Sequence, residues 1–216
     1  IYNMYPTKTS LLIAILVMSI TSMVLENAAP TWAYGISKGL TTLLVLLLAS
    51  SNKQISRLGA RVVTALFFCL LGDLALLWDG GFLFGLGFFL IAHLLFIRAF
   101  RARFGIKFHW IALLITASLA ISTLYFIWPN VSGVLQGAII GYIAVIGIMS
   151  SLSMSIALNK RSKIRMQLGL GGLLFMISDA FLGINAFAIP IPFASILILT
   201  TYWGAITSLA IAAREF

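Results

Sequence analysis

The 216-residue sequence has very few charged residues, and acidic residues are especially scarce. Charged residues make up 9% of the chain and hydrophobic residues 62%, whereas about 25% of an ordinary globular protein is charged. We therefore expect an integral, multi-pass membrane protein, in the inner membrane if the source is bacterial. A helix needs about 20 apolar residues to cross a bilayer, so the chain has room for roughly eight spans. Because little else remains, any active site must lie among these helices.

Cysteine is nearly absent as well. Cys69 is the only one, which excludes an intrachain disulfide and a Cys-x-x-Cys metal site. We expect Cys69 to be a small buried residue of an apolar helix. We also expect no metal and no cofactor, because zinc sites usually contain more histidine or cysteine than the three candidate ligands here, Asp73, His93 and Asp179.

Apolar runs and their breaks predict an all-α fold, with eight transmembrane helices in one domain over residues 1–216. The first run follows Lys8 in the manner of a signal peptide, but no small-residue cleavage site follows it, so we expect a retained helix. The predicted spans are 9–25, 31–50, 61–77, 82–99, 109–128, 132–157, 167–188 and 191–212.

Basic residues outnumber acidic ones by 14 to five, and every one except Lys38 falls in alternate loops or at the ends. The positive-inside rule then places those loops and both termini in the cytoplasm. We attribute the net charge of +9 mainly to topology, with some attraction to anionic membrane lipids, and expect no nucleic-acid partner. The residues are Lys8; Lys53, Arg57 and Arg61; Arg98, Arg101, Arg103 and Lys107; Lys160, Arg161, Lys163 and Arg165; and Arg214.

Two repeating patterns concern helix packing. Gly133, Gly137 and Gly141 form a small-xxx-small row, which predicts a close helix contact. The sequence around Asp73, FFCLLGDLALL, is similar to the sequence around Asp179, LLFMISDAFLG, about half the chain away. This similarity suggests a four-plus-four internal repeat, as in some membrane folds.

Four ionisable residues fall within the predicted spans: Lys38, Asp73, His93 and Asp179. A charged side chain near the bilayer centre costs about 2.5–3.5 kcal/mol on insertion scales, so each is a candidate functional residue. Their positions place all four at or beyond the midplane on the side away from the basic loops, where they are suited to line one cavity.

The same residues also fit structural roles, which the sequence leaves open. Asp73 could bond a neighbouring helix or form a buried ion pair with Lys38, and Lys38 could instead extend to the membrane surface. His93 could be a core residue that bonds a backbone carbonyl. Tyr142 and Asn185 are further candidates for binding substrate, although contacts between helices also explain them.

Two carboxyl groups in one dry cavity have a predictable chemistry. One tends to be protonated while the other is ionised, which provides an acid and a base in a single site. Such a pair can protonate a substrate and activate water. A site that opens sideways into the bilayer would select an amphiphilic substrate.

Three motifs together resemble the YhhN-like lysoplasmalogenase family of multi-pass membrane proteins. They are Gly72-Asp73 at the end of one helix, Gly85, Phe89 and His93 at four-residue spacing in the next, and Ser178-Asp179 late in the chain. Lys38 and the following GLTTLL resemble a lysine-containing helix of the family, with Gly39 in place of the usual proline. The last helix has the aromatic pair Tyr202 and Trp203, but Ile206 stands where the family has a polar residue.

The resemblance implies hydrolysis of the vinyl ether bond of lysoplasmalogens to a fatty aldehyde and a glycerophospho-alcohol. Protonation of the β-carbon gives an oxocarbenium ion, which water captures as a hemiacetal that then collapses. One aspartate, Asp73 or Asp179, would donate the proton, and the other would stabilise the cation and deprotonate water, as carboxylate pairs do in glycoside hydrolysis. Lys38 would meet the substrate phosphate, and His93 would orient an aspartate or the water.

Two other functions also use intramembrane carboxylates. An intramembrane aspartyl protease usually has Gly-x-Gly-Asp, whereas residues 70–73 read Leu-Leu-Gly-Asp. A proton-coupled transporter would use Asp73, Asp179 and His93 as a relay. Transport requires access from both faces of the membrane, whereas the four ionisable residues of the spans are predicted to lie toward one face.

Overall fold

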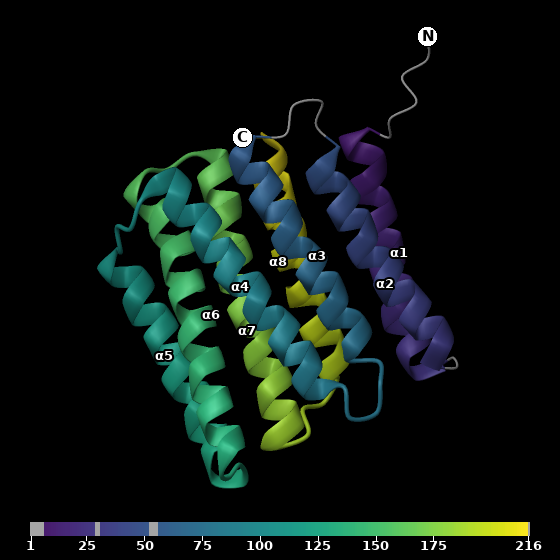
Figure 1. Cartoon of the computed structure of the whole chain (residues 1–216). Coiled ribbons are helices and arrows are strands. Elements are labelled where there is room, and N and C mark those ends of the chain that lie inside the picture. Colours follow the sequence, from purple (N-terminus) through teal and green to yellow (C-terminus); the bar gives the residue numbers. More distant parts are fainter. Residues whose placement is uncertain (1–6, 29–30, 52–55, 216) are drawn as a thin grey trace. The chain divides into compact units, whose positions relative to one another are not determined.

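A computed structural model describes residues 7–28, 31–51 and 56–215, and every regular element in these ranges is helical (Figure 1). The elements are α1 (Lys8–Ala28), α2 (Thr31–Ser50), α3 (Arg57–Ala75), α4 (Phe82–Phe104), α5 (Trp110–Ile127), the short 3-10 helix η1 (Trp128–Asn130), α6 (Val134–Asn159), α7 (Lys163–Phe187) and α8 (Ala194–Glu215).

Eight of the helices in the described ranges are long and apolar enough to cross a membrane. The all-α prediction is therefore confirmed, and the chain is an integral multi-pass membrane protein. Some boundaries differ from the predicted ones: α3 begins at Arg57, α7 begins at Lys163, and α4 continues to Phe104. The predicted spans were ended near basic residues. The helices continue through these residues, because a long basic side chain can reach polar surroundings while its backbone stays helical.

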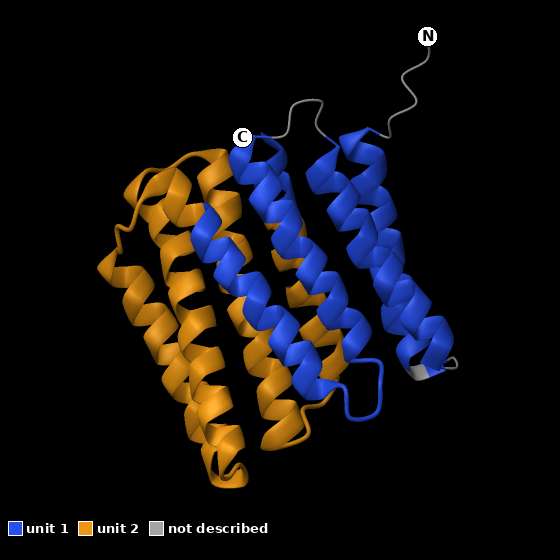
Figure 2. Cartoon of the chain, in the orientation of Figure 1, with its two compact units in different colours: residues 1–99, 210–216 blue, residues 100–209 orange. Residues whose placement is uncertain are grey.

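The chain forms two compact units (Figure 2). Unit 1 comprises residues 1–99 and 210–216, and unit 2 comprises residues 100–209. Each unit is described by itself below. The single domain and the internal repeat expected from the sequence stay predictions.

Unit 1 contains α1, α2, α3, most of α4 and the last turns of α8. Helix α1 packs on α2, where the buried Ser37 hydroxyl donates to Ser22 Oγ at 3.0 Å. An ion pair between Lys8 and Glu215 joins the start of α1 to the end of α8. The α3–α4 turn is tight, because a Cβ on Gly81 would overlap the Ala75 carbonyl oxygen. Only glycine fits there.

Unit 2 contains α5, α6, α7 and most of α8, and small residues bring α6 and α7 together. A Cβ on Gly172 would overlap Ser153 Oγ, and one on Gly169 would lie 2.7 Å from Ala157 Cβ. The Ser150 hydroxyl donates to the Gly172 carbonyl oxygen at 2.9 Å across the same contact. Close backbone approach at small residues is a common way for helices to associate in membranes.

The predicted contact at Gly133, Gly137 and Gly141 is wrong. Apart from the adjoining backbone of the same segment, no atom of the described chain lies within 4 Å of a Cβ built at any of the three. Gly133 instead occupies the turn before α6 with φ 62°, a conformation that favours glycine. Spacing alone does not show which of several glycine-rich helix faces meets a neighbour.

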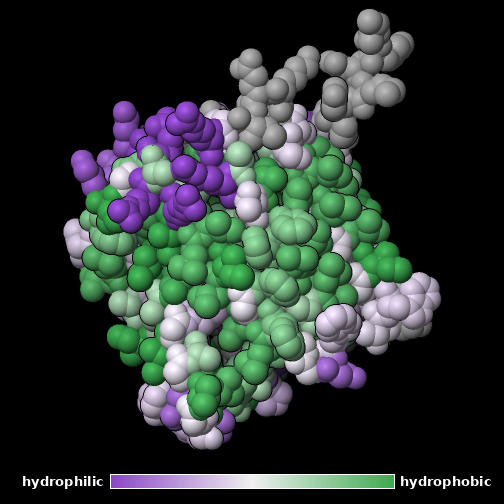
Figure 3. All heavy atoms as spheres, in the orientation of Figure 1, coloured by the Kyte–Doolittle hydropathy of each residue, from purple (hydrophilic) through white to green (hydrophobic). Residues whose placement is uncertain are grey.

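The basic connections of unit 2 are fixed at one end of its helices. The Asn159 amide donates to the Lys107 carbonyl oxygen at 3.0 Å, and the Arg165 guanidinium lies 5.0 Å from the Phe104 ring centroid. Two helices start here with side-chain caps: His109 Nδ1 accepts from Ile111 N, and Ser162 Oγ accepts from Arg165 N. In unit 2 the hydrophilic surface gathers at this end, and the sides of the helices are hydrophobic (Figure 3). Lys53, from another predicted basic loop, lies outside the described residues.

The predicted topology can be tested with single cysteines in a Cys69→Ala background, because Cys69 itself is fully buried. We expect cysteines at the exposed positions Asp79 and Asn130 to react with a membrane-impermeant maleimide in intact cells. We expect cysteines at Lys107 and Arg161 to react only after permeabilisation, because alternate basic loops face the cytoplasm. Labelling of Arg161→Cys in intact cells would contradict this orientation.

Candidate active site

Asp73 in α3 is held by two side chains from α2. Its Oδ1 lies 3.5 Å from Lys38 Nζ, and its Oδ2 accepts a hydrogen bond of 2.6 Å from the Thr42 hydroxyl. All three residues are buried, Asp73 being 1% exposed and Lys38 6%. Lys38 Nζ also lies 5.9 Å from the centre of the Tyr34 ring. The sequence left two structural roles open for Lys38. In the structure it forms the buried ion pair with Asp73 and does not extend to the membrane surface.

Thr42 was not a candidate from the sequence, although a signal was present. Lys38 and Thr42 are four residues apart in α2, so they lie on one face of the helix. A lysine and a hydroxyl on one helix face form a suitable pair of donors for a carboxylate on a neighbouring helix. The spacing alone could not identify Asp73 as that carboxylate.

The packing of α3 on α4 determines where His93 lies. A Cβ on Gly72 would lie 2.8 Å from the Phe89 ring, and one on Gly85 would lie 2.8 Å from the Leu76 side chain. His93 is one turn beyond Phe89 on the same face of α4, and it is fully buried. Gly85 and Phe89 of the Gly-x-x-x-Phe-x-x-x-His spacing therefore pack on α3, and His93 continues the same face of α4 in the buried interior.

The second aspartate, Asp179, belongs to unit 2. It is half-buried in α7, and its Oδ2 accepts a hydrogen bond from the Tyr142 hydroxyl of α6. The close α6–α7 packing brings these two side chains together. Ser178, the other half of the Ser-Asp motif, donates instead to the Ile198 carbonyl oxygen of α8 at 3.0 Å. The motif thus holds α7 between α6 on one side and α8 on the other.

Asn185 has a different environment from the other candidates. It is exposed near the end of α7, where its Oδ1 accepts from the Ile191 backbone N–H at 2.9 Å. This bond closes the connection between α7 and α8. The contact explains Asn185 as a turn residue, and nothing in its described surroundings points to substrate.

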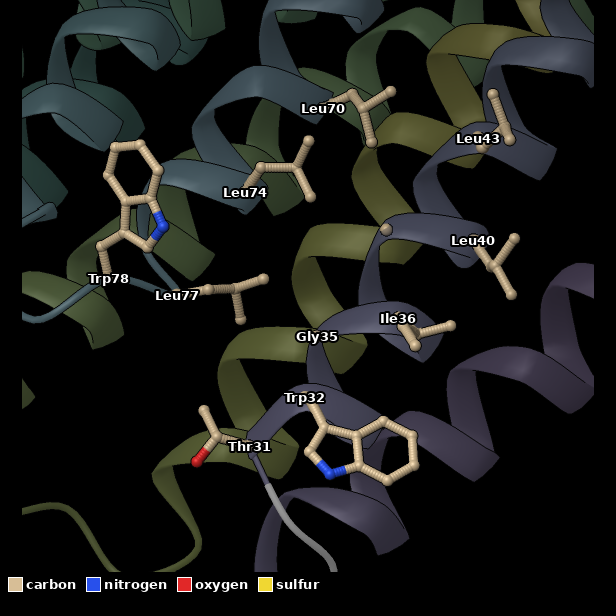
Figure 4. Close-up of a pocket in the computed structure, with 11 residues that line it drawn as sticks. Thr31, Trp32, Gly35, Ile36, Leu40, Leu43, Leu70, Leu74, Leu77 and Trp78 are labelled. Atoms are coloured by element: carbon tan, nitrogen blue, oxygen red, sulfur yellow. The ribbon is translucent and has the colours of Figure 1, made fainter.

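An open apolar groove with a volume of about 660 Å³ runs between α2 and α3 of unit 1 (Figure 4). Ile36, Leu40 and Leu43 contribute from α2, and Leu70, Leu74 and Leu77 from the α3 side. Two glycines of α2, Gly35 and Gly39, also line the groove, and Trp32 and Trp78 lie at the end where α2 starts and α3 finishes.

Possible metal ligands do not gather in this structure. The described residues contain no group of three histidine, cysteine, aspartate or glutamate side chains arranged to hold a metal ion. Each of the two aspartates instead meets hydrogen-bonding side chains of a neighbouring helix. The arrangement suits proton transfer and charge stabilisation by carboxyl groups.

The described chain thus has eight apolar helices that can cross a membrane. Two aspartates inside these helices accept hydrogen bonds from side chains of neighbouring helices. These features define a multi-pass membrane protein with carboxyl groups among its helices. A sequence model of the YhhN family matches residues 33–213, nearly the whole chain. The chain belongs to the YhhN family.

The relatives of this chain include mammalian lysoplasmalogenases and an uncharacterized bacterial membrane protein. Lysoplasmalogenase TMEM86A of Bos taurus is 29% identical over 88% of this chain and 82% of its own length. Lysoplasmalogenase TMEM86B of Sus scrofa is 31% identical over 82% of this chain and 73% of its own. The uncharacterized membrane protein YhhN of Escherichia coli is 33% identical, over 47% of this chain and 49% of its own. No solved structure matches this chain significantly.

Proposed function

We propose that this protein is a lysoplasmalogenase, a membrane hydrolase that cleaves the vinyl ether bond of a lysoplasmalogen. The family match and the names of the mammalian relatives support the reaction class. Neither the protease nor the transporter suggested by the sequence is favoured by these relatives. The structural observation that carries the proposal is the anchoring of Asp73 and Asp179 by side chains of neighbouring helices.

The reaction needs a proton donor and a group that stabilises positive charge. Protonation of the β-carbon of the vinyl ether converts it to an oxocarbenium ion. Water adds to the cationic carbon and loses a proton, and the resulting hemiacetal collapses to an aldehyde and an alcohol. We assign the donor role to one of Asp73 and Asp179, and to the other the roles of stabilising the cation and accepting the proton from water.

Neighbouring side chains would support these roles. Thr42 and Lys38 fix the Asp73 carboxylate, and Tyr142 fixes Asp179. A carboxyl group that is already oriented needs little reorganisation when charge develops in the substrate. In this proposal Lys38 acts through Asp73 rather than through the substrate phosphate, because its ammonium is buried against that carboxylate.

The test is aldehyde release from a lysoplasmenyl phospholipid by the purified protein in detergent. We expect turnover of this lipid and none of a lysophospholipid with an ester-linked acyl chain, which lacks the vinyl ether. Absence of aldehyde from protein that remains folded would reject the proposed function. Release of a fatty acid from the ester control would indicate a different lipase activity.

A further inference from the structure

The α2–α3 groove lies beside the Lys38–Asp73 ion pair. Lys38 directly precedes Gly39, and Asp73 directly precedes Leu74, and both Gly39 and Leu74 line the groove. The groove therefore passes the level of the ion pair on the adjacent face of the same two helices. Anything lying in the groove would be close to the carboxylate that we assign to the reaction.

The length of the groove matches one leaflet of a bilayer. Along α2 it extends from Thr31 to Leu43, which corresponds to about 18 Å at the helical rise per residue. The hydrocarbon core of a membrane is about 30 Å thick, so one leaflet is about 15 Å. A groove that starts near one end of membrane-spanning helices and has this length would reach roughly to the midplane, as a single lipid chain does.

The polarity of the groove lining also changes along its length, as the polarity of a lipid changes from headgroup to chain. Trp32 and Trp78 are 70% and 75% exposed at the end where α2 starts, and Thr31 adds a hydroxyl to the lining there. Indole rings are typical of the membrane interface, where lipid headgroups lie. Beyond them the lining consists of leucine, isoleucine and glycine, and the glycines leave room that side chains would otherwise occupy.

From this geometry we propose that the α2–α3 groove is the binding site for the hydrocarbon chain of the lysolipid substrate. The headgroup end lies toward Trp32 and Trp78, and the chain extends toward Leu43 and Leu70. A lysolipid has one chain, which suits one groove of single-leaflet depth. This inference rests on the proposed function for the identity of the lipid, but the groove's affinity for a lysolipid can be measured without turnover.

The test is Gly39→Leu, with Gly87→Leu as its matched control. A Cβ at Gly39 would meet only Leu74 Cδ2, at the ordinary contact distance of 3.5 Å, so the rest of the leucine side chain can enter the groove. Apart from the adjoining backbone of α4, no described atom lies within 4 Å of a Cβ built at Gly87, and Gly87 does not line the groove. Both variants add the same side chain to a membrane-spanning helix of unit 1.

Aldehyde release is measured for a series of lysoplasmenyl lipids of increasing chain length. We expect Gly39→Leu to lower kcat/KM for the longest chain by about 10–50-fold, because about two or three chain methylenes lose their contacts. The effect will shrink as the chain shortens, and Gly87→Leu will stay within about twofold of the wild type. A Gly39→Leu profile that matches the wild type, or falls equally at every length, would overturn the assignment.

A second measurement separates this inference from the proposed function. With Trp110, Trp128 and Trp203 replaced by phenylalanine in all three proteins, a lysolipid brominated near the headgroup end of its chain should quench the fluorescence of Trp32 and Trp78 in the otherwise wild-type protein and in Gly87→Leu, and less in Gly39→Leu. Quenching without aldehyde release would uphold the groove and reject the reaction. Aldehyde release with equal quenching in all three proteins would reject the groove and uphold the reaction.

Discussion

Asp73→Asn and Asp179→Asn will each lower aldehyde release from a lysoplasmenyl lipid by about 10²–10⁴-fold, the usual contribution of a general acid or base. Asparagine preserves the shape of aspartate and can still accept the hydrogen bonds that Thr42 and Tyr142 donate. It cannot supply a proton of comparable acidity or a negative charge. The loss should therefore appear in kcat, with a smaller change in KM.

Asp79→Asn is the matched control for both variants. Asp79 is an exposed carboxylate in the turn between α3 and α4, so its replacement should leave the rate within about twofold of the wild type. Full activity in either Asp73→Asn or Asp179→Asn would contradict the two-carboxylate proposal. If only one variant lost activity, the reaction would depend on a single carboxyl group, with water or another residue as its partner.

The membrane spans were predictable from the sequence because a bilayer imposes a simple requirement on composition. Any helix that crosses it needs a long apolar run, and such runs are visible without knowledge of packing. The ends were less predictable. The predicted span at 61–77 continued past Ala75, where α3 finishes, because the apolar residues of the tight α3–α4 turn extend the hydropathy signal.

The charged residues of the candidate site were also predictable, because a charge inside a span is rare and costly. The pairing of Lys38 with Asp73 was among the possibilities that the sequence left open, but the hydrogen-bonding partners of the two aspartates were not identified. Thr42 is an ordinary helix residue until the packing places it beside Asp73, and Tyr142, although a candidate from the sequence, could not be assigned to Asp179. The α6–α7 contact at Gly172 shows the same limit, since the sequence equally suggested the glycine row in α6, which meets no neighbour in the described structure.

Lys38→Met will lower the free energy of unfolding by on the order of 3–5 kcal/mol, the usual cost of removing one partner of a buried ion pair. The side chains of Lys38 and Asp73 are only 8% and 2% exposed, so the remaining carboxylate would lack its ammonium partner and stay shielded from water. Methionine keeps the length and apolar stem of lysine, which limits the loss of packing. Denaturant titration of the purified protein in mixed micelles measures the change.

The double variant Lys38→Met/Asp73→Asn distinguishes the ion pair from a phosphate-binding role for Lys38. Because it removes both charges, we expect most of the lost stability to return, while aldehyde release stays as low as in Asp73→Asn. A protein that is stable but inactive would show that the Lys38–Asp73 pair is needed for the reaction and not only for folding. If Lys38→Met instead raised KM and left the unfolding free energy unchanged, Lys38 would be a substrate ligand and the ion pair would contribute little to stability.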